Sequence, residues 1–196
     1  MDRNQICFAK VRTDAIIPSK KEEDAGYDIY ACLTENFIAI PTNHTELVPT
    51  GIASAFDASK YIQIEERGST GSKGIKKSAG VIDSGFRGEW FVAITNCSDI
   101  TLIISKQSKG ELEANMIKDQ YGDLYVLDAS NNPVYLYYLD LDGSYVPCYL
   151  YYSSEKAIAQ AIIHEVPRMK VEEISYGELQ QIESYRSTNM LGSTNK

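Results

Sequence analysis

The chain has 196 residues and a formal net charge of −8, with 27 acidic side chains against 19 lysines and arginines. This length suits one domain with a substantial core, and we expect a single domain over residues 1–196. The negative charge argues against a protein that binds nucleic acid or an acidic membrane surface. We see no apolar run long enough to cross a bilayer and no charged-then-apolar leader, which predicts a cytoplasmic protein.

The cysteines and histidines indicate neither a disulfide framework nor a metal centre. The two histidines, His44 and His164, are far apart in the sequence, which argues against a zinc site held by protein ligands. The cysteines lie mostly in apolar, strand-like surroundings, so we expect free, buried thiols. They are scattered and include no Cys-x-x-Cys pair: Cys7, Cys32, Cys97 and Cys148.

Short strand-forming runs divided by turn residues fill the first third of the chain. Proline, glycine and aspartate separate these runs, and a helical period is almost absent. This close spacing of short strands predicts an all-β fold of the barrel or jelly-roll type. The expected strands lie at residues 6–11, 29–32, 37–40, 45–48, 52–56 and 61–65.

Residues 79–90 read AGVIDSGFRGEW and place one carboxylate, Asp83, between two glycine-containing turn signals. Val81 and Ile82 before it and Trp90 after it favour strands, so we expect a β-hairpin with Asp83 at its tip. An aspartate at a turn often only bonds nearby backbone, so this pattern alone leaves a structural and a catalytic role open.

Residues 66–74, ERGSTGSKG, combine small and hydroxyl-bearing residues between two basic side chains, Arg67 and Lys73. Small residues let backbone N–H groups point at oxyanions, and an arginine adds a bidentate fork. The order and spacing of a P-loop are absent. The composition therefore suits either a phosphate cradle or a flexible surface loop.

Five motifs, taken in order, make the chain resemble the trimeric-type dUTPases, which split dUTP into dUMP and pyrophosphate. The third motif is the most specific, and together the five cover the chain nearly end to end. The resemblance implies a jelly-roll-like β barrel that forms a homotrimer with shared active sites. The motifs are DAGYD at 24–28, ERGSTGSKG at 66–74, AGVIDSGFRGE at 79–89, AIAQ at 157–160 and RSTNMLGST at 186–194.

The resemblance also implies a role for each motif residue. Asp83 would hold and deprotonate the water that attacks the α-phosphorus, and Asp28 would steady a Mg²⁺ ion on the triphosphate. The backbone at Gly80 and Ile82 would pair with the polar edge of uracil, and Phe86 would pack beneath the deoxyribose. The residues that would bind phosphate oxygens are Arg67, Ser69, Gln160 and Arg186.

The last motif lies on an expected flexible arm, residues 185–196, whose Ser, Thr, Asn and Gly composition cannot bury much apolar surface. Ser193 and Thr194 would close this arm over the γ-phosphate. Leu191 stands where the family has an aromatic residue that covers the base.

Three further departures from the family pattern leave the chemistry in place. Phe86 replaces a tyrosine, and Gly68 replaces the serine after the motif-two arginine, so Ser69 would have to reach instead. Glu155 and Lys156 replace the Gly-Asp turn before AIAQ.

The related dCTP deaminases are the alternative enzyme, because they share the barrel and a similar turn. They carry a glutamate for proton transfer on the following strand, where this chain has Ala93. Cytosine deamination needs that acid–base group, so dUTP hydrolysis is preferred.

Residues 105–152 form an apparent insertion between the third and fourth motifs. Turn signals at 131–133 and 142–143 divide it into an expected three-stranded β meander. Tyrosine-rich surfaces are common at protein contacts, so a regulatory protein-binding role is a third hypothesis, alongside simple packing on the barrel. Phage-borne dUTPases resemble this arrangement. The segment holds nine of the 14 tyrosines: Tyr121, Tyr125, Tyr135, Tyr137, Tyr138, Tyr145, Tyr149, Tyr151 and Tyr152.

Overall fold

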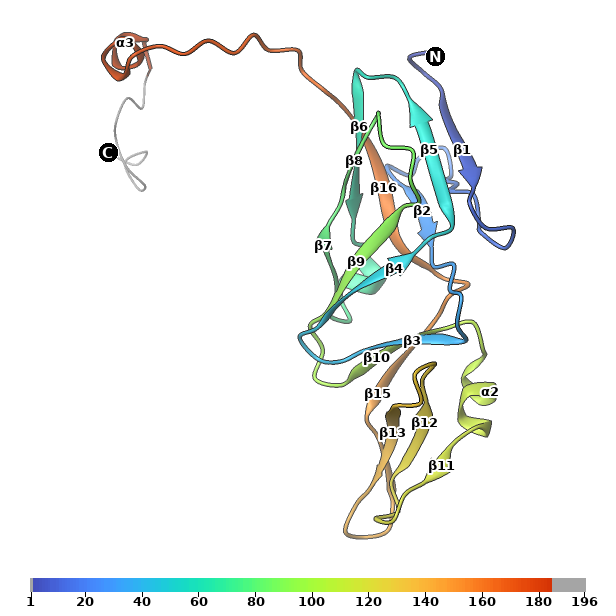
Figure 1. Ribbon diagram of the computed structural model, residues 1–196. Coiled ribbons are helices and arrows are strands. Elements are labelled where there is room, and N and C mark those ends of the chain that lie inside the picture. Colours follow the sequence, from blue (N-terminus) through green and yellow to red (C-terminus); the bar gives the residue numbers. More distant parts are fainter. Residues whose placement is uncertain (1, 185–196) are drawn as a thin grey trace. The chain divides into compact units, whose positions relative to one another are not determined.

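The computed structural model describes residues 2–184, and the chain divides into two units after Val166. The first unit is built from strands in several small sheets, which confirms the expected all-β, jelly-roll-like class. Figure 1 shows the barrel strands surrounding one core, with further strands extending from one end. The second unit begins at Pro167, and its described residues, 167–184, contain one short helix.

The barrel is made of four sheets. Strand boundaries match the expected runs to within two residues, because proline and glycine end the strands where the sequence places them. The sheets are β1 (Ile6–Lys10) with β5 (Ile52–Phe56); β2 (Tyr27–Tyr30), β16 (Ala157–Glu165), β6 (Lys60–Glu65) and β8 (Val81–Asp83); β4 (Thr45–Pro49), β9 (Phe91–Asn96) and β7 (Ile75–Ala79); and β15 (Tyr149–Ser153), β10 (Thr101–Ser105) and β3 (Phe37–Ile40).

The expected hairpin around Asp83 is not a hairpin. β8 pairs with β6, and in this pairing Asp83 lies opposite Tyr61. β9, which follows the turn, pairs instead with β4 and β7. The turn itself is present, since Phe86 N donates to Asp83 O at 3.0 Å. The chain therefore changes sheets at this turn, and Asp83 lies at the end of a strand.

The insertion contains a helix, α2 (Lys109–Ala114), and a separate four-stranded antiparallel sheet. This is one strand more than the expected meander, together with a helix that was not expected. The sheet is ordered β11 (Ile117–Lys118), β12 (Leu124–Leu127), β13 (Pro133–Leu139) and β14 (Tyr145–Pro147).

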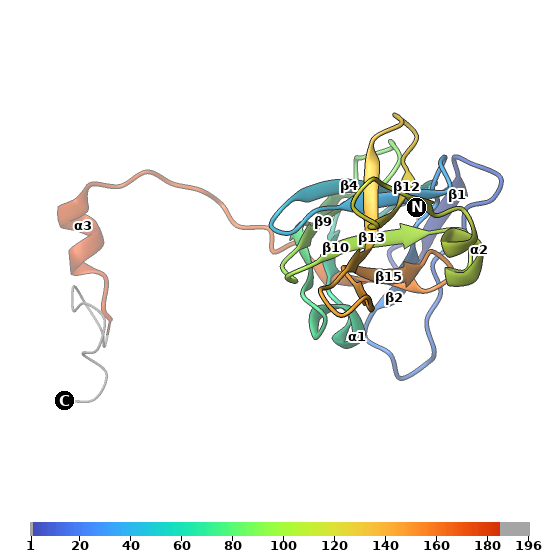
Figure 2. The same cartoon turned by 90° about the horizontal axis from the view of Figure 1, so that it is seen from below.

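The insertion joins two parallel neighbours in the barrel. β10 enters it and β15 leaves it, and Thr101 to Ser105 pair in register with Tyr149 to Ser153. In Figure 2 these two strands run alongside each other, with α2 close to one end. Because parallel neighbours need a crossover connection, a tight turn cannot replace this segment.

Strand β10 is buried on both faces. Leu102 and Ile104 belong to the barrel core, while Ile103 between them belongs to a second cluster with Leu112 of α2 and Leu136 of β13. Alternate residues of a strand point to opposite faces, so β10 separates the two clusters. The insertion therefore covers an apolar outer face of the barrel.

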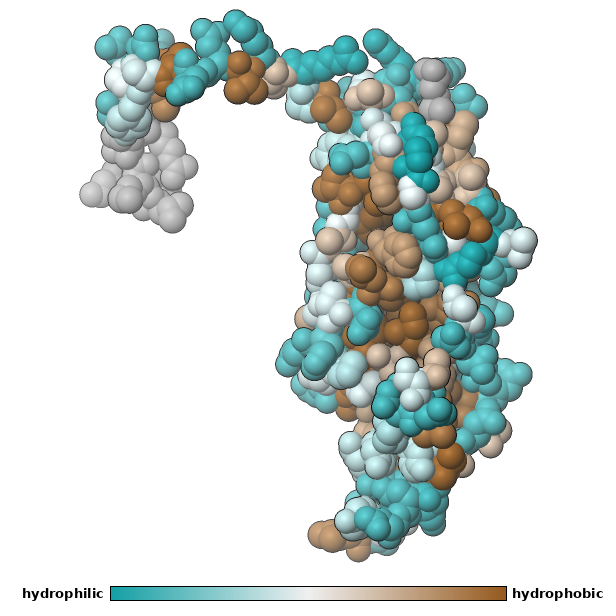
Figure 3. All heavy atoms as spheres, viewed as in Figure 1, coloured by the Kyte–Doolittle hydropathy of each residue, from teal (hydrophilic) through white to brown (hydrophobic). Residues whose placement is uncertain are grey.

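In contrast, β4 and β9 each leave one large apolar side chain exposed. Val48 and Val92 face the core, whereas Leu47 is 64% and Phe91 46% exposed. Figure 3 shows apolar side chains gathered on the barrel face over β4, β5 and β9. Such a patch marks a surface suited to contact with another molecule.

Besides α2, the described part of the chain has two short helices. α1 (Gly68–Gly71) lies in the second motif, and α3 (Tyr176–Gln181) lies in the second unit. The Ser175 side chain accepts from Glu178 N, and the Glu178 carboxylate accepts from Ser175 N, which is a capping box at the start of α3.

All four cysteines are free, as expected, but only Cys32 is buried, since Cys7 and Cys97 are exposed and Cys148 is half-buried. Within residues 2–184, no helix combines the length and apolar character that a membrane span requires.

Candidate active site

A polar hollow of about 410 Å³ brings together the first, second and fourth motifs. Asp28 lies on β2, Gln160 on the adjacent β16, and Arg67 and Ser69 at the start of α1. Four predicted site residues thus line one cavity. Its lining is completed by Asp24, Ala25, Gly26 and Gly68.

Arg67 makes a fork-like ion pair with Asp28 inside this hollow. Its Nε lies 3.0 Å from Asp28 Oδ1, and its Nη2 donates to Asp28 Oδ2 at 3.4 Å. The Nη1 group lies 3.5 Å from the carbonyl oxygen of Ala157. The guanidinium is therefore held at one wall of the cavity, where it could bind a phosphate in the same bidentate way.

Thr70 fixes the backbone of Arg67 and was not singled out by the sequence. Its side chain is fully buried, its hydroxyl accepts from Arg67 N at 3.1 Å, and the same hydroxyl donates to Arg67 O at 2.9 Å. The hydroxyl-rich run after Arg67 is the signal that could have identified it.

The Gln160 side chain packs close to the backbone of Gly26 in this hollow. The Gln160 Nε2 donates to Glu66 O at 2.8 Å, which leaves its second N–H available to a ligand. A Cβ at position 26 would lie 2.7 Å from Gln160 Oε1. Glycine is thus required in the first motif because any side chain would displace Gln160.

The third-motif residues lie elsewhere in the same chain. Asp83 is exposed at the end of β8, and Phe86 is 44% exposed in the turn that follows. Arg87 stabilises this turn, since its Nη1 donates to Phe86 O at 2.9 Å. At Gly80, whose carbonyl accepts from Ile64 N, an added Cβ would lie 2.8 Å from Ile64 O.

Within one chain, Asp83 does not reach the polar hollow. In the sheet register, Gln160 of β16 pairs with Asp28 of β2 on one side and with Glu65 of β6 on the other. Asp83 pairs instead with Tyr61, which lies four residues from Glu65 along β6. Three strand spacings and four residues correspond to about 20 Å between Asp28 and Asp83. The structure therefore brings four predicted site residues together and places Asp83, Gly80, Ile82 and Phe86 in a second group.

The predicted residues of the C-terminal arm, Arg186, Leu191, Ser193 and Thr194, lie outside the described residues. Their contribution to either group stays a prediction.

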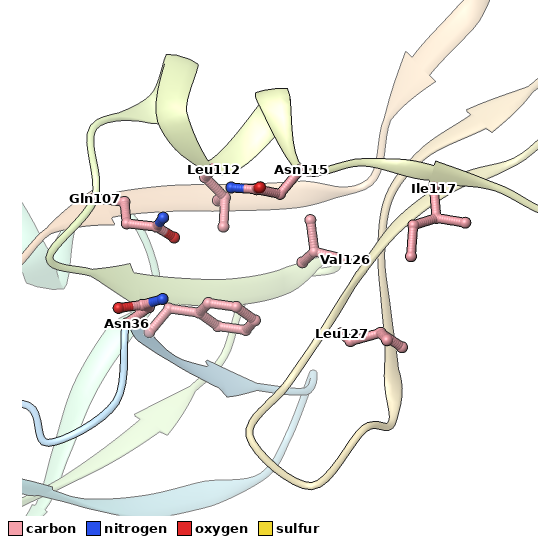
Figure 4. A pocket seen from close by; sticks show the side chains of 8 residues that line it. Asn36, Gln107, Leu112, Asn115, Ile117, Val126 and Leu127 are labelled. Atoms are coloured by element: carbon pink, nitrogen blue, oxygen red, sulfur yellow. The ribbon is translucent and has the colours of Figure 1, made fainter.

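A second hollow of about 390 Å³ lies where the insertion meets the barrel and contains none of the predicted site residues. Figure 4 shows the apolar side chains of Leu112 and Val126 facing the amide-bearing Asn36 and Gln107. Its lining carries no charge, unlike the Asp28 hollow: Asn36, Phe37, Gln107, Leu112, Asn115, Ile117, Val126 and Leu127.

The structure is thus a strand-rich β-barrel whose polar hollow holds arginine, hydroxyl and carboxylate groups. Comparison with known proteins identifies the family. The dUTPase family model matches residues 13–109. The deoxyuridine 5'-triphosphate nucleotidohydrolase of Leptospira interrogans is 36% identical over 104 residues, which are 51% of this chain and 71% of that protein. The deoxyuridine 5'-triphosphate nucleotidohydrolase of Picosynechococcus is 31% identical over 123 residues, which are 61% of this chain and 84% of that protein.

Solved structures agree on the fold. The dUTPase of Staphylococcus bacteriophage 80alpha, solved with dUPNHPP, has a TM-score of 0.65 and 16% sequence identity to this chain. The matched region covers 98% of this chain and 99% of the phage protein. The S. aureus phage phi11 dUTPase, described as having a species-specific insert, has a TM-score of 0.58 and 16% identity, with coverage of 87% and 96%.

The chain belongs to the dUTPase family. It is a dUTP diphosphatase that hydrolyses dUTP to dUMP and pyrophosphate, and the deaminase alternative is not favoured.

Proposed function

We propose that the two groups of residues divide the hydrolysis of dUTP between them. The observation that carries this proposal is the single hollow lined by Asp28, Arg67, Ser69 and Gln160. Arg67, Ser69 and Gln160 bind phosphate oxygens there, because they offer a charged fork, a hydroxyl and an amide N–H. Their donors neutralise charge on the phosphates as the α-phosphorus is attacked.

Asp83 is the general base in this proposal. Its carboxylate is exposed and, among the described residues, has no hydrogen-bond or ion-pair partner. It accepts a proton from a water whose oxygen attacks the α-phosphorus. The bond from that phosphorus to the oxygen bridging to the β-phosphate breaks, and pyrophosphate leaves with the electron pair.

A complete active site requires more than one copy of the chain. Reacting atoms must approach within about 3.5 Å, and the separation of about 20 Å between Asp28 and Asp83 within one chain prevents Asp83 from reaching a phosphate bound beside Asp28. A homotrimer with shared active sites meets this requirement. The exposed apolar residues Leu47 and Phe91 offer contact area for such an assembly.

Mg²⁺ is the proposed cofactor, and Asp28 is its protein contact. Asp24 and Asp28 line the same hollow, but within residues 2–184 no three His, Cys, Asp or Glu side chains are grouped as metal ligands. This sparse set suits an ion that keeps its waters and is held mainly by substrate phosphates. When bound, the ion would offset phosphate charge. A structural Mg(II) ion is described for the phage phi11 dUTPase.

β8 and the residues on either side of it select the substrate in this proposal. The backbone at Gly80 and Ile82 pairs with the polar edge of uracil, and the exposed ring of Phe86 packs beneath the deoxyribose. Arg186 binds phosphate, Ser193 and Thr194 close over the γ end, and Leu191 contacts the base.

Asp83→Asn tests the proposal because it keeps the size of the side chain and removes the base. We expect kcat for dUTP to fall by about 10² to 10⁴ while the substrate still binds. Asp99→Asn, at another exposed aspartate, is the matched control and should turn over normally. Unchanged kcat in Asp83→Asn would exclude Asp83 as the base.

A second function is supported by the insertion. Residues 105–152 carry three lysines against seven carboxylates, a formal charge of −4. Two neighbouring turns, joined by the hydrogen bond from Leu139 N to Asp123 Oδ1, expose Tyr121 at 76% and Leu141 at 108%. An acidic surface with exposed apolar side chains suits a basic protein partner.

One solved relative points the same way, since phage dUTPases are described as controlling the transfer of virulence genes. A photo-crosslinker at position 141 should capture a partner protein in the host cell, whereas one at Glu46 on the barrel should not. Equal capture from both positions would remove the support for this function.

A further inference from the structure

Three side chains of the second motif surround one tyrosine that the motifs do not include. Tyr152 lies on β15, the strand that returns from the insertion, and is only 4% exposed. The ammonium group of Lys73 lies 6.0 Å from the centre of its ring. The Arg67 and Ser69 side chains are near enough to its hydroxyl to act on its pKa. One buried residue thus lies beside the arginine, the serine and the lysine of ERGSTGSKG.

The hydrogen bonds of the Tyr152 hydroxyl define what it can do. It donates its single proton to Ala157 O at 2.7 Å, and the same carbonyl oxygen lies 3.5 Å from Arg67 Nη1. With its donor used, the hydroxyl oxygen can only accept, and the nearby donors are Arg67 and Ser69. Ala157 begins β16, three residues before Gln160. The hydroxyl therefore links the second motif to the strand that carries the fourth.

An acceptor without charge suits this position. Burial raises the pKa of Tyr152 above 10, and the Asp28 charge adds to this, although the neighbouring Arg67 opposes it. The phenol is therefore neutral at pH 7, where the carboxylates are ionised. It can orient Arg67 and Ser69 without adding a negative charge that would repel a triphosphate, as a second carboxylate beside Asp28 would.

We propose that Tyr152 is a positioning residue that holds the Arg67 guanidinium and the Ser69 hydroxyl in the geometry that binds the triphosphate. This inference rests on the phosphate-binding roles proposed above for Arg67 and Ser69. It also makes the insertion part of the active-site architecture, because the strand that carries Tyr152 is placed by the chain returning from α2 and β11 to β14.

Tyr152→Phe, with Tyr151→Phe as its control, tests the inference. Each variant keeps the ring and loses one hydrogen bond to a backbone carbonyl, since Tyr151 OH donates to Gln107 O at 2.7 Å, away from the phosphate site. Loss of the hydroxyl that orients Arg67 should reduce kcat/KM for dUTP about 5- to 30-fold in Tyr152→Phe. Tyr151→Phe should stay within about twofold of the parent, since it loses only stability.

Binding measurements separate positioning from a general structural effect. Tyr152→Phe should weaken binding of a nonhydrolysable dUTP analogue and leave binding of deoxyuridine, which has no phosphate, unchanged. Equal losses for both ligands, or equal kcat/KM losses in the Tyr151 and Tyr152 variants, would overturn the inference.

Arg67→Ala distinguishes a failure of this inference from a failure of the proposed function. If Arg67→Ala retains the parental kcat/KM, the phosphate-binding role is wrong and Tyr152 cannot act through it. If Arg67→Ala is impaired and Tyr152→Phe is not, only the role of Tyr152 is overturned. When both roles hold, adding Tyr152→Phe to Arg67→Ala should cost less than about twofold, because coupled residues are not additive.

Discussion

Arg67 Nε lies 3.0 Å from Asp28 Oδ1, so the residue proposed to bind phosphate is paired with the residue proposed to hold Mg²⁺. Both side chains are 34% exposed. Substrate and ion would therefore compete with, or rearrange, this contact between Arg67 and Asp28.

Asp28→Asn should separate the two roles of this pair. Because the pair is partly exposed, we expect the free energy of unfolding to change by less than about 1 kcal/mol. We expect the Mg²⁺ concentration that gives half-maximal activity to rise. Urea unfolding and magnesium titrations of kcat/KM measure the two effects. Glu165→Gln, which removes the exposed ion pair with Lys60, should change neither by much. Unaltered magnesium dependence in Asp28→Asn would contradict the assignment.

Gly80→Ala should destabilise the protein, whereas Gly85→Ala should not. A Cβ at position 80 would lie 2.8 Å from Ile64 O and 2.9 Å from Ile64 Cβ, but one at position 85 meets nothing within 4 Å. Forcing β8 and β6 apart should cost about 1 to 3 kcal/mol, as overpacking generally does. Chemical denaturation of both variants provides the comparison. A Gly80→Ala protein as stable as Gly85→Ala would show that the strands can shift freely.

Acid should weaken the junction between α2 and the insertion sheet through Glu113. Burial alone would raise the pKa of Glu113, but hydrogen bonds from the Tyr137 and Tyr149 hydroxyls hold it below its usual 4.5. A lowered folded-state pKa contributes stability that is present above pH 4.5 and is lost as the pH falls through the folded value.

Hydrogen exchange of α2 at pH 7 and at acid pH measures this loss. Glu113→Gln should make protection of α2 less dependent on pH in this range, and Glu46→Gln, on the exposed face of β4, should retain the parental dependence. The idea fails if the Glu113→Gln variant loses protection at acid pH as steeply as the parent.

Removing residues 117–147, with a short glycine-rich link from α2 to β15, should lower Tm. The deletion uncovers Ile103 and Leu112, which are 0% and 1% exposed in the second cluster. Burying such side chains stabilises by about 1.5 to 3 kcal/mol each. Thermal unfolding and light scattering detect the change. Adding Ile103→Thr and Leu112→Gln to the deletion should reduce aggregation. If the deletion variant without these substitutions has the same Tm as the parent, the four-stranded sheet is only an accessory to the barrel.

The local sequence determined the strands in the first third of the chain, because β-branched runs favour strands and proline and glycine end them. It also contains signals for two helices: Ser108 with Glu111 and Ser175 with Glu178 form capping boxes, and each pair begins a helix in the structure. The five motifs were enough to indicate the family and the reaction.

Only the tertiary structure decided which strands pair and which motif residues meet. Asp83 was expected at a hairpin tip because the local pattern favoured a turn, but pairing with Tyr61 on β6 is a long-range contact that no local pattern encodes. The same applies to Tyr152, which reads as one tyrosine among nine in the insertion. Its place beside Arg67 follows from the parallel pairing of β15 with β10 and from the return of the chain to Ala157, so residues 85 positions apart in sequence share one carbonyl oxygen.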